Sequence, residues 1–294
     1  MKSGFVSLIG RPNVGKSTLL NAIVGKKVAI TSSTAQTTRN MIQGVYHGDN
    51  LQIIFVDTPG IHKPQNKLGQ VLNKQAYYSI NDVDVILFLT DVTQNLGTGD
   101  KFILEKLKET EVPVILVLNK IDKIPYDKIL PKIAEYKDLF PFQEIIPVSA
   151  FKQKNLDELI KVVSNYLNDD IKYYDDETIT NVSTTFSISE LIREKVLYFT
   201  KEEVPHSVTC IVEDISEDKN NISIGASIIV DRENLKKILI GKNGAMIKKI
   251  GVEARHDIEE LLNKKVYLDL RVKVVDNWRE KEQFLNQMGY EDFN

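Results

Sequence analysis

A glycine-containing run, Gly10-Arg11-Pro12-Asn13-Val14-Gly15-Lys16-Ser17, separates an apolar stretch at residues 5–9 from a helix-like stretch at residues 19–24. In such a loop the backbone N–H groups converge on an anion, and the N-terminal end of the following helix adds a positive dipole. The pattern is typical of a nucleoside triphosphate site, in which Lys16 would contact the β and γ phosphates and Ser17 would bind Mg²⁺. The residues of this segment that we expect to contact the nucleotide are Gly10, Asn13, Val14, Gly15, Lys16, Ser17 and Thr18.

Length and composition set broad limits on the chain. Its 294 residues are enough for two domains, each with a core of its own. The single cysteine, Cys210, cannot form an internal disulfide, and no apolar stretch approaches the roughly 20 residues needed to span a bilayer. The first residues also lack the apolar core of a signal sequence. We therefore expect a cytoplasmic protein, and peripheral contact with the inner face of the cell membrane stays open. We also expect a monomer, although the sequence does not determine the oligomeric state.

The first half of the chain alternates short apolar runs with amphipathic ones, which is the pattern of a doubly wound α/β domain. The expected strands are residues 51–56, 83–89, 114–118 and 145–148, and the expected helices are residues 68–79, 101–108, 129–139 and 156–167. Turn residues at 48–50 separate residues 41–47 from the strand at 51–56. This spacing predicts a hairpin and therefore one antiparallel edge strand.

A run rich in acidic residues at 168–177 interrupts this alternation and marks the expected linker. We predict a first domain at residues 1–168, a linker at 169–180 and a second domain at 181–294. In the second domain the expected elements are a helix at 187–200, strands at 207–213 and 221–230, a pair of helices around residues 241–244, and a strand at 266–275. Their order predicts a smaller α+β domain.

Asn119, Lys120 and Asp122 follow an apolar strand, at the edge where open α/β sheets bind nucleotides. The Asp122 carboxylate can accept from both N1–H and the exocyclic amine of guanine, a pair of donors that adenine lacks. We expect Asn119 to contact N7 and the Lys120 stem to lie over the base. Ser149 and Ala150 follow a later strand, which would place the Ala150 N–H at guanine O6. The pattern therefore predicts GTP rather than ATP as the ligand.

The run Asp57-Thr58-Pro59-Gly60 closes the strand at residues 51–56 and supplies a carboxylate for the metal site. The Gly60 N–H can contact the γ phosphate. Hydrolysis would break this contact, so residues 60–70 would act as a switch. The same residues also fit an ordinary type I turn, which is compatible with this function.

Two adjacent threonines lie in the polar stretch at residues 31–40, and one of them should complete the Mg²⁺ shell in the GTP state. We favour Thr38, but the sequence leaves Thr37 open as the alternative.

The position after the switch glycine is unusual, because Ile61 stands where many GTPases have a glutamine that orients the attacking water. Isoleucine can neither donate nor accept a hydrogen bond. This predicts slow intrinsic hydrolysis or another source of electrostatic stabilisation. Asn13 is a candidate for holding K⁺, and an amide that only stabilises its own loop is the alternative. The residues that we expect to take part in catalysis are Lys16, Asn13, Thr38 and Gly60.

In the second domain, the run Ile240-Gly241-Lys242-Asn243-Gly244 joins two helical stretches. Two glycines around a polar pair allow a nucleic acid backbone to approach closely, as in the loop of the KH fold. The formal net charge of −3 gives no general attraction to RNA, but residues 235–249 contain lysines and no acidic residue. A solvated helix face, or a helix hairpin with a glycine cap, is the alternative. The expected RNA-binding residues are Lys236, Lys237, Ile240, Gly241, Lys242, Asn243, Gly244, Lys248 and Lys249.

Taken as a whole, the chain resembles the Era family of bacterial GTPases, in which a Ras-like P-loop GTPase domain precedes a type II KH domain. The resemblance covers essentially all residues. It is carried by the segments 10–17, 35–39, 57–60 and 119–122, which other GTPases share, and by the segments 189–195 and 240–251, which single out this family.

The resemblance implies a switch that hydrolyses GTP to GDP with Mg²⁺ and that K⁺ can support. It further implies binding of small-subunit (16S) ribosomal RNA near its 3′ end, a role in assembly of the small ribosomal subunit, and a coupling to growth and division.

Two other functions share part of the pattern. An enzyme that uses GTP to drive RNA modification would have the same phosphate and base motifs, but the chain shows no second set of catalytic residues. An RNA-binding protein with a remnant nucleotide site is the other alternative, and the complete set of nucleotide motifs argues against it.

Overall fold

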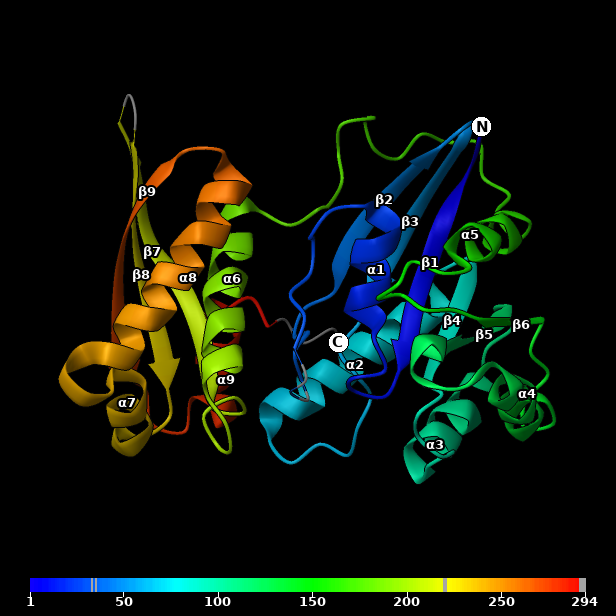
Figure 1. Ribbon diagram of the computed structural model, residues 1–294, viewed down its shortest axis with the longest axis horizontal. Helices are drawn as coiled ribbons and strands as arrows, with labels where there is room; N and C mark the ends of the chain where they lie inside the picture. The colour runs from blue at the N-terminus through cyan, green and yellow to red at the C-terminus, as the bar shows by residue number, and fades with distance from the viewer. Residues whose placement is uncertain (33, 35, 219–220, 291–294) are drawn as a thin grey trace.

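The computed structural model describes residues 1–32, 34, 36–218 and 221–290. Two sheets, each covered by its own helices, form two lobes that lie side by side (Figure 1). The segment at residues 165–183 connects them and contains neither a helix nor a regular strand.

The first sheet has six strands in the order β2-β3-β1-β4-β5-β6. The strands are β1 (Lys2–Gly10), β2 (Ile42–Gly48), β3 (Leu51–Asp57), β4 (Val85–Asp91), β5 (Val114–Asn119) and β6 (Glu144–Pro147). All neighbouring strands are parallel except β2 and β3, which form an antiparallel hairpin. The predicted doubly wound domain and its antiparallel edge are confirmed. Because the strand order reverses beside β1, the loop after β1 lies at the switch point where such sheets bind ligands.

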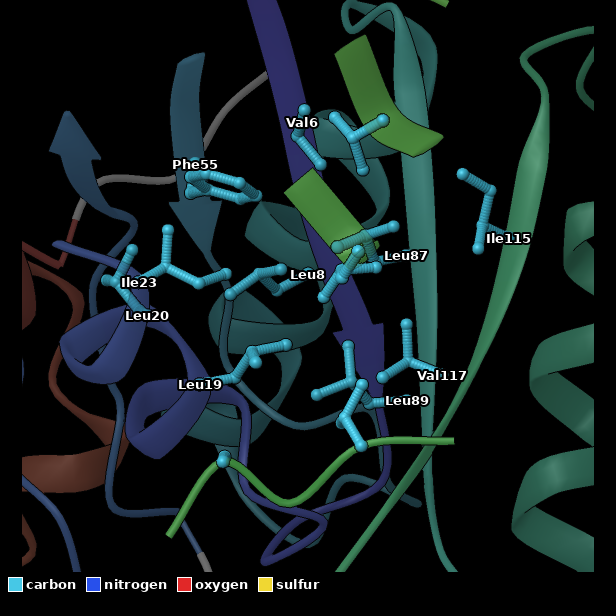
Figure 2. Packing of buried hydrophobic residues seen from close by; sticks show 14 of the residues in the cluster. Val6, Leu8, Leu19, Leu20, Ile23, Phe55, Leu87, Leu89, Ile115 and Val117 are labelled. Atoms are coloured by element: carbon cyan, nitrogen blue, oxygen red, sulfur yellow. The ribbon is translucent and has the colours of Figure 1, made fainter. Parts of the chain in front are cut away.

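Helices cover both faces of this sheet. On one face lie α1 (Lys16–Val24) and α5 (Leu156–Ser164), and on the other lie α2 (Lys67–Asn81), α3 (Thr98–Leu107) and α4 (Ile129–Lys137). Two short 3-10 helices, η1 (Ile121–Lys123) and η2 (Tyr126–Lys128), precede α4. Figure 2 shows Leu19 and Leu20 of α1 near Leu8 of β1 and Phe55 of β3, all fully buried. This packing holds the start of α1 at the carboxyl edge of the sheet.

The second sheet has three strands, β7 (Val208–Glu217), β8 (Asn221–Val230) and β9 (Lys265–Val274), in the order β7-β8-β9. The pair β7 and β8 is antiparallel, whereas β8 and β9 are parallel. The helices are α6 (Thr184–Phe199), α7 (Glu233–Ile240) and α8 (Ala245–Leu262), with η3 (Lys242–Gly244) between the last two. Apolar residues of these helices and of the sheet share one core, which confirms the predicted α+β domain.

After β9 the structure has η4 (Trp278–Glu280) and α9 (Glu282–Gln287), two elements that were not predicted from the sequence. Trp278 is fully buried and belongs to an apolar cluster with Leu285, and with Leu68 and Leu72 of α2. The N-terminal half of α2 therefore packs against the second lobe, while its C-terminal half packs on the first sheet. The two lobes share a small core of their own.

None of the helices in these described ranges combines the length and apolar character needed to cross a membrane.

Candidate nucleotide-binding and RNA-binding sites

The loop between β1 and α1 makes close contacts at two glycines, Gly15 within the loop and Gly60 in the loop after β3, and neither position has room for a side chain. Gly15 has φ +100°, and a Cβ there would lie 2.3 Å from Asn119 Nδ2. A Cβ on Gly60 would lie 2.7 Å from the backbone nitrogen of Pro12. Because φ at Gly15 is in the left-handed region, any other residue would be strained as well as obstructed. The glycines thus bring three loops together around the N-terminal end of α1.

Lys16 begins α1 and is buried, with Nζ 3.2 Å from the carbonyl oxygens of both Gly10 and Arg11. Burial lowers the pKa of Lys16 to about 8, although the charge of Asp57 works in the opposite direction. An ammonium group held in this way is poised to bind an anion, because the negative charge of a phosphate would replace the stabilisation by water that burial has removed.

Ser17, Thr38 and Asp57 bring three oxygens together at the end of β3. Ser17 Oγ donates to Asp57 Oδ2 at 2.6 Å, and Thr38 Oγ1 donates to the same oxygen at 3.1 Å. The two hydroxyl oxygens are 2.8 Å apart. Asp57 is fully buried, and burial raises its pKa, while its Oδ1 has no hydrogen-bond partner among the described residues. Three hard oxygens and an uncompensated carboxylate oxygen fit a divalent cation such as Mg²⁺.

The structure distinguishes the two neighbouring threonines. Thr37 Oγ1 donates to the carbonyl oxygen of Thr34 at 2.6 Å, so its hydroxyl points into its own loop. Thr38, in contrast, lies with Ser17 and Asp57. Ala35, which belongs to the same predicted motif, lies outside the described residues.

A cavity of about 330 Å³ lies beside these groups. It is lined by the predicted residues Asn13, Gly15, Lys16, Ser17, Thr18, Thr37, Thr38, Gly60 and Lys120. Thr31, Ser32 and Gln36 also line it, and sequence analysis did not name them as site residues. Their polar stretch was recognised, but no pattern within it shows which side chains face the cavity.

Asn119 ties three loops together, a role that sequence analysis did not anticipate. Its Nδ2 donates to the Val14 carbonyl at 2.9 Å, and its Oδ1 accepts from the backbone N–H groups of Lys120 at 2.8 Å and Ala150 at 3.0 Å. Val14 and Ala150 are buried at these contacts. The phosphate loop and the two predicted base-binding loops therefore hold one another in place.

The other residues predicted to bind the base lie close to Asn119. Lys120 Nζ donates to the Asn13 carbonyl at 2.7 Å and to Asp91 Oδ2 at 2.6 Å. Asp122 is exposed, and its Oδ1 accepts from Ser149 Oγ at 2.5 Å. Asp91 was not predicted, although its place at the carboxyl end of β4 is a signal that could have indicated it. A hydrogen bond thus orients the carboxylate of Asp122, while the side chain stays accessible to a ligand.

Ile61 is buried in the core between the sheet and α2, so it cannot act on a substrate in the cavity. The next residue, His62, instead joins the polar stretch at residues 31–40 to the switch segment at residues 60–70. Gln36 Nε2 donates to His62 Nε2 at 2.6 Å, and His62 Nδ1 donates to the Gly60 carbonyl at 2.8 Å. This histidine was not among the residues predicted from the sequence.

In the second domain, the loop from Gly241 to Gly244 has three residues with positive φ: Gly241 at +72°, Asn243 at +51° and Gly244 at +77°. The side chains of Lys242 and Asn243 are exposed between the two glycines. The loop leads directly into the N-terminal end of α8. A backbone with this shape leaves room for a phosphate to approach the helix end.

The predicted lysines surround the loop but differ in their contacts. Lys237 and Lys248 are exposed, and Lys236 is half-buried. Lys249 Nζ lies 4.3 Å from the ring centroid of Phe199, so this lysine contacts α6. Ile240 packs on the edge of the core, where it supports the loop from below.

Beside the loop, a cavity of about 370 Å³ runs between α8 and β9. Its lining combines apolar side chains with the polar residues Lys248, Arg255, Tyr267 and Asp269. Tyr267 is 68% exposed, which suits stacking of its ring on a base. Among these, only Lys248 was predicted from the sequence, because α8 and β9 meet through tertiary packing.

Two family models match the chain. The model described as "50S ribosome-binding GTPase" matches residues 5–120, and the model described as "KH domain" matches residues 203–279. They fall on the two lobes.

Two solved structures match over nearly the whole length. One is Era in complex with MgGDPNP and nucleotides 1506–1542 of 16S ribosomal RNA, at 43% identity over 99% of both chains and a TM-score of 0.96. The other is a point variant of Era from Aquifex aeolicus bound to GDP.AlF4⁻, also at 43% identity over 99% of both chains, with a TM-score of 0.95. A nucleotide site, a KH loop and similarity of this extent place the chain in the Era family of GTPases, with a GTPase domain followed by a C-terminal KH domain.

Proposed function

We propose that this chain is a GTP-hydrolysing switch that binds small-subunit (16S) ribosomal RNA near its 3′ end and acts in assembly of the small ribosomal subunit. The observation that carries the proposal is the 43% identity, over 99% of both chains, to an Era protein solved with a GTP analogue and that RNA. The family description that names the 50S subunit matches residues 5–120, which end before the KH loop. The full-length relative is therefore the better guide to the RNA.

In this proposal residues 1–168 form the nucleotide-binding domain, residues 169–180 the linker and residues 181–294 the RNA-binding domain. Lys16 and the amides of the phosphate loop stabilise charge on the transferred phosphate. Ser17 and Thr38 hold Mg²⁺, Asp57 orients it, and the metal when bound neutralises phosphate charge. The Gly60 N–H contacts the γ phosphate, and Asp122 selects guanine. The protein would act as a cytoplasmic monomer, and contact with a membrane surface stays a hypothesis.

Hydrolysis is expected to depend on the monovalent cation, because Ile61 is buried and cannot orient water. Asn13 has φ +64° and lies on the rim of the cavity, where its side chain could hold K⁺ next to the phosphates. We expect turnover in K⁺ to exceed turnover in Na⁺ by about ten-fold, since a correctly placed charge at the transition state is worth at least that much. Phosphate release measured in the two salts at equal ionic strength tests this. Equal rates would exclude a K⁺ site at Asn13.

The proposed switch is tested by RNA affinity in two nucleotide states. A single-stranded RNA matching the 3′ end of 16S ribosomal RNA is titrated against the full chain with GDP and then with GDPNP. We expect tighter binding with GDPNP, by about ten-fold, because a coupling of 1–3 kcal/mol between two sites is typical. The same affinity in both states would make the two domains independent. Absence of RNA binding would contradict the proposed partner.

A further inference from the structure

The helix α6 contains the segment Ser189 to Lys195, which the nucleotide and RNA sites described above do not use. Its Arg193 is fully buried and lies between the two domains. Arg193 Nη2 donates a hydrogen bond to the carbonyl oxygen of Thr37 in the first domain. Thr37 directly precedes Thr38, whose hydroxyl lies with Ser17 and Asp57. A residue of the second domain thus holds the peptide group next to the candidate metal ligand.

Residues 37–39 of the first domain alternate in what they contact. The first and third contact the second domain, and the middle one contacts the candidate metal site. The Thr37 carbonyl faces Arg193, and the Thr38 hydroxyl faces the candidate metal site. The Arg39 guanidinium, also fully buried, donates to the carbonyl oxygens of Val208 at 2.6 Å and Pro205 at 3.2 Å. Movement of this segment away from Asp57 would therefore break its contacts with the second domain as well.

Arg193 is held rigidly in the position that this contact requires. Its Nε donates to Glu190 Oε1 at 2.7 Å and its Nη2 to Glu190 Oε2 at 2.6 Å, a two-point pair one turn apart on α6. Burial alone would lower the pKa of Arg193. The charge and hydrogen bonds of Glu190 have the larger combined effect and raise this pKa, so the guanidinium stays charged. A planar, fixed donor loses little conformational entropy when it binds a carbonyl group.

Stability alone does not explain this arrangement. Burial lowers the pKa of Arg39, and the charge of the nearby, also buried Arg193 lowers it further. Apolar side chains of similar volume would fill such a space at a lower cost in desolvation. The buried polar contacts instead fix the position of residues 37–39 with respect to α6.

We propose that Arg193 is a positioning residue for the GTPase site, supplied by the KH domain, which holds Thr38 where it can bind the metal ion of the GTP state. The inference rests on the proposed role of Thr38. It has a reciprocal consequence, because coupling free energies are mutual. Docking of the KH domain strengthens GTP binding, and GTP strengthens docking by the same factor. GDP, which lacks the γ phosphate, takes no part in this coupling.

The test compares the affinities of the full chain for GDPNP and for GDP, both with Mg²⁺. Arg193→Met paired with Glu190→Gln keeps the volume and removes both buried charges together. We expect this double variant to bind GDPNP about ten-fold more weakly, as expected for a lost hydrogen bond to a charged donor, and GDP as before. It should also need more Mg²⁺ for half-maximal GDPNP binding. Unchanged GDP affinity in the same preparation shows that the nucleotide domain is folded.

Two further variants make the result specific. Asp257→Asn weakens another ion pair between the domains, that of Asp257 with Lys27, which involves neither residues 37–39 nor the switch segment at residues 60–70. It should leave the ratio of the two affinities unchanged. Arg193→Lys keeps the charge but cannot reach Glu190 and Thr37 together, so it should fall between the wild type and the double variant.

Thr38→Ala separates this inference from the role on which it rests. If Thr38→Ala leaves the ratio of GDPNP to GDP affinity unchanged, Thr38 is not the metal ligand and the inference fails with it. If Thr38→Ala lowers GDPNP affinity but the double variant does not, Thr38 keeps its role and Arg193 has no positioning function. Equal weakening of both nucleotides by the double variant would show a purely structural residue and would also overturn the inference.

Discussion

Replacing Asp122 by Asn is expected to weaken GTP binding by about a hundred-fold or more, because a site built to accept two N–H groups would then offer one acceptor and one unmatched donor. Xanthosine triphosphate should bind more tightly to the variant than to the wild type. Xanthine carries a carbonyl in place of the exocyclic amine of guanine, so the Asn amide can donate to it. The hydrogen bond from Ser149 Oγ to Asp122 Oδ1 holds the side chain in the orientation that this reading needs.

Competition of GTP and xanthosine triphosphate against a fluorescent GDP analogue measures the effect. Asp127→Asn is a matched control, because this aspartate is also exposed and follows the same strand but lies outside the base-binding motif. It should leave both affinities unchanged. An Asp122→Asn variant with the wild-type preference for GTP would show that this residue does not read the base.

The second large effect is expected at the KH loop. Gly244→Asp should lower RNA affinity by about a hundred-fold and leave GTP affinity unchanged, because it places a negative charge where a phosphate must approach. The two loop glycines are equivalent in the sequence motif but differ in their surroundings. A Cβ on Gly241 would lie 2.8 Å from Met246 Cβ and 2.9 Å from its backbone nitrogen, whereas a Cβ on Gly244 meets nothing within 4 Å. Gly244 therefore tests the charge without displacing the start of α8.

Gly244→Asn is the matched control for this prediction. Asn has nearly the shape of Asp but carries no charge. Either residue is destabilised by about 1 kcal/mol in the left-handed backbone conformation at φ +77°. RNA binding of the three proteins is measured by fluorescence anisotropy, with GTP binding measured alongside. We expect Asn to weaken RNA binding much less than Asp. Equal losses would mean that backbone shape rather than charge at this loop controls binding, and loss of GTP binding as well would mean that the variant had unfolded.

The strands, the helices and the phosphate loop could be predicted because each depends on residues adjacent in the chain. The anion site predicted for the run from Gly10 to Ser17 would use the backbone amides of the run itself, so its sequence and its flanking strand and helix are sufficient for the prediction. Hydrophobic periodicity in the same way predicted both domains and the hairpin of β2 and β3. The segment after β9 escaped prediction because its α9 is only six residues long and Trp278 is buried against a distant helix.

The sequence by itself determined which motifs the chain carries, and it predicts from them which chemical groups would contact a nucleotide and RNA, because those groups lie in short contiguous segments. Only the tertiary structure decided how they are combined. It directed the hydroxyl of Thr38, and not that of Thr37, toward Asp57. It let Asn119 hydrogen-bond to three loops and placed Arg193 against a loop 156 residues away. It also formed the groove between α8 and β9. Such contacts depend on where side chains from distant segments meet, and that is set by packing rather than by local pattern.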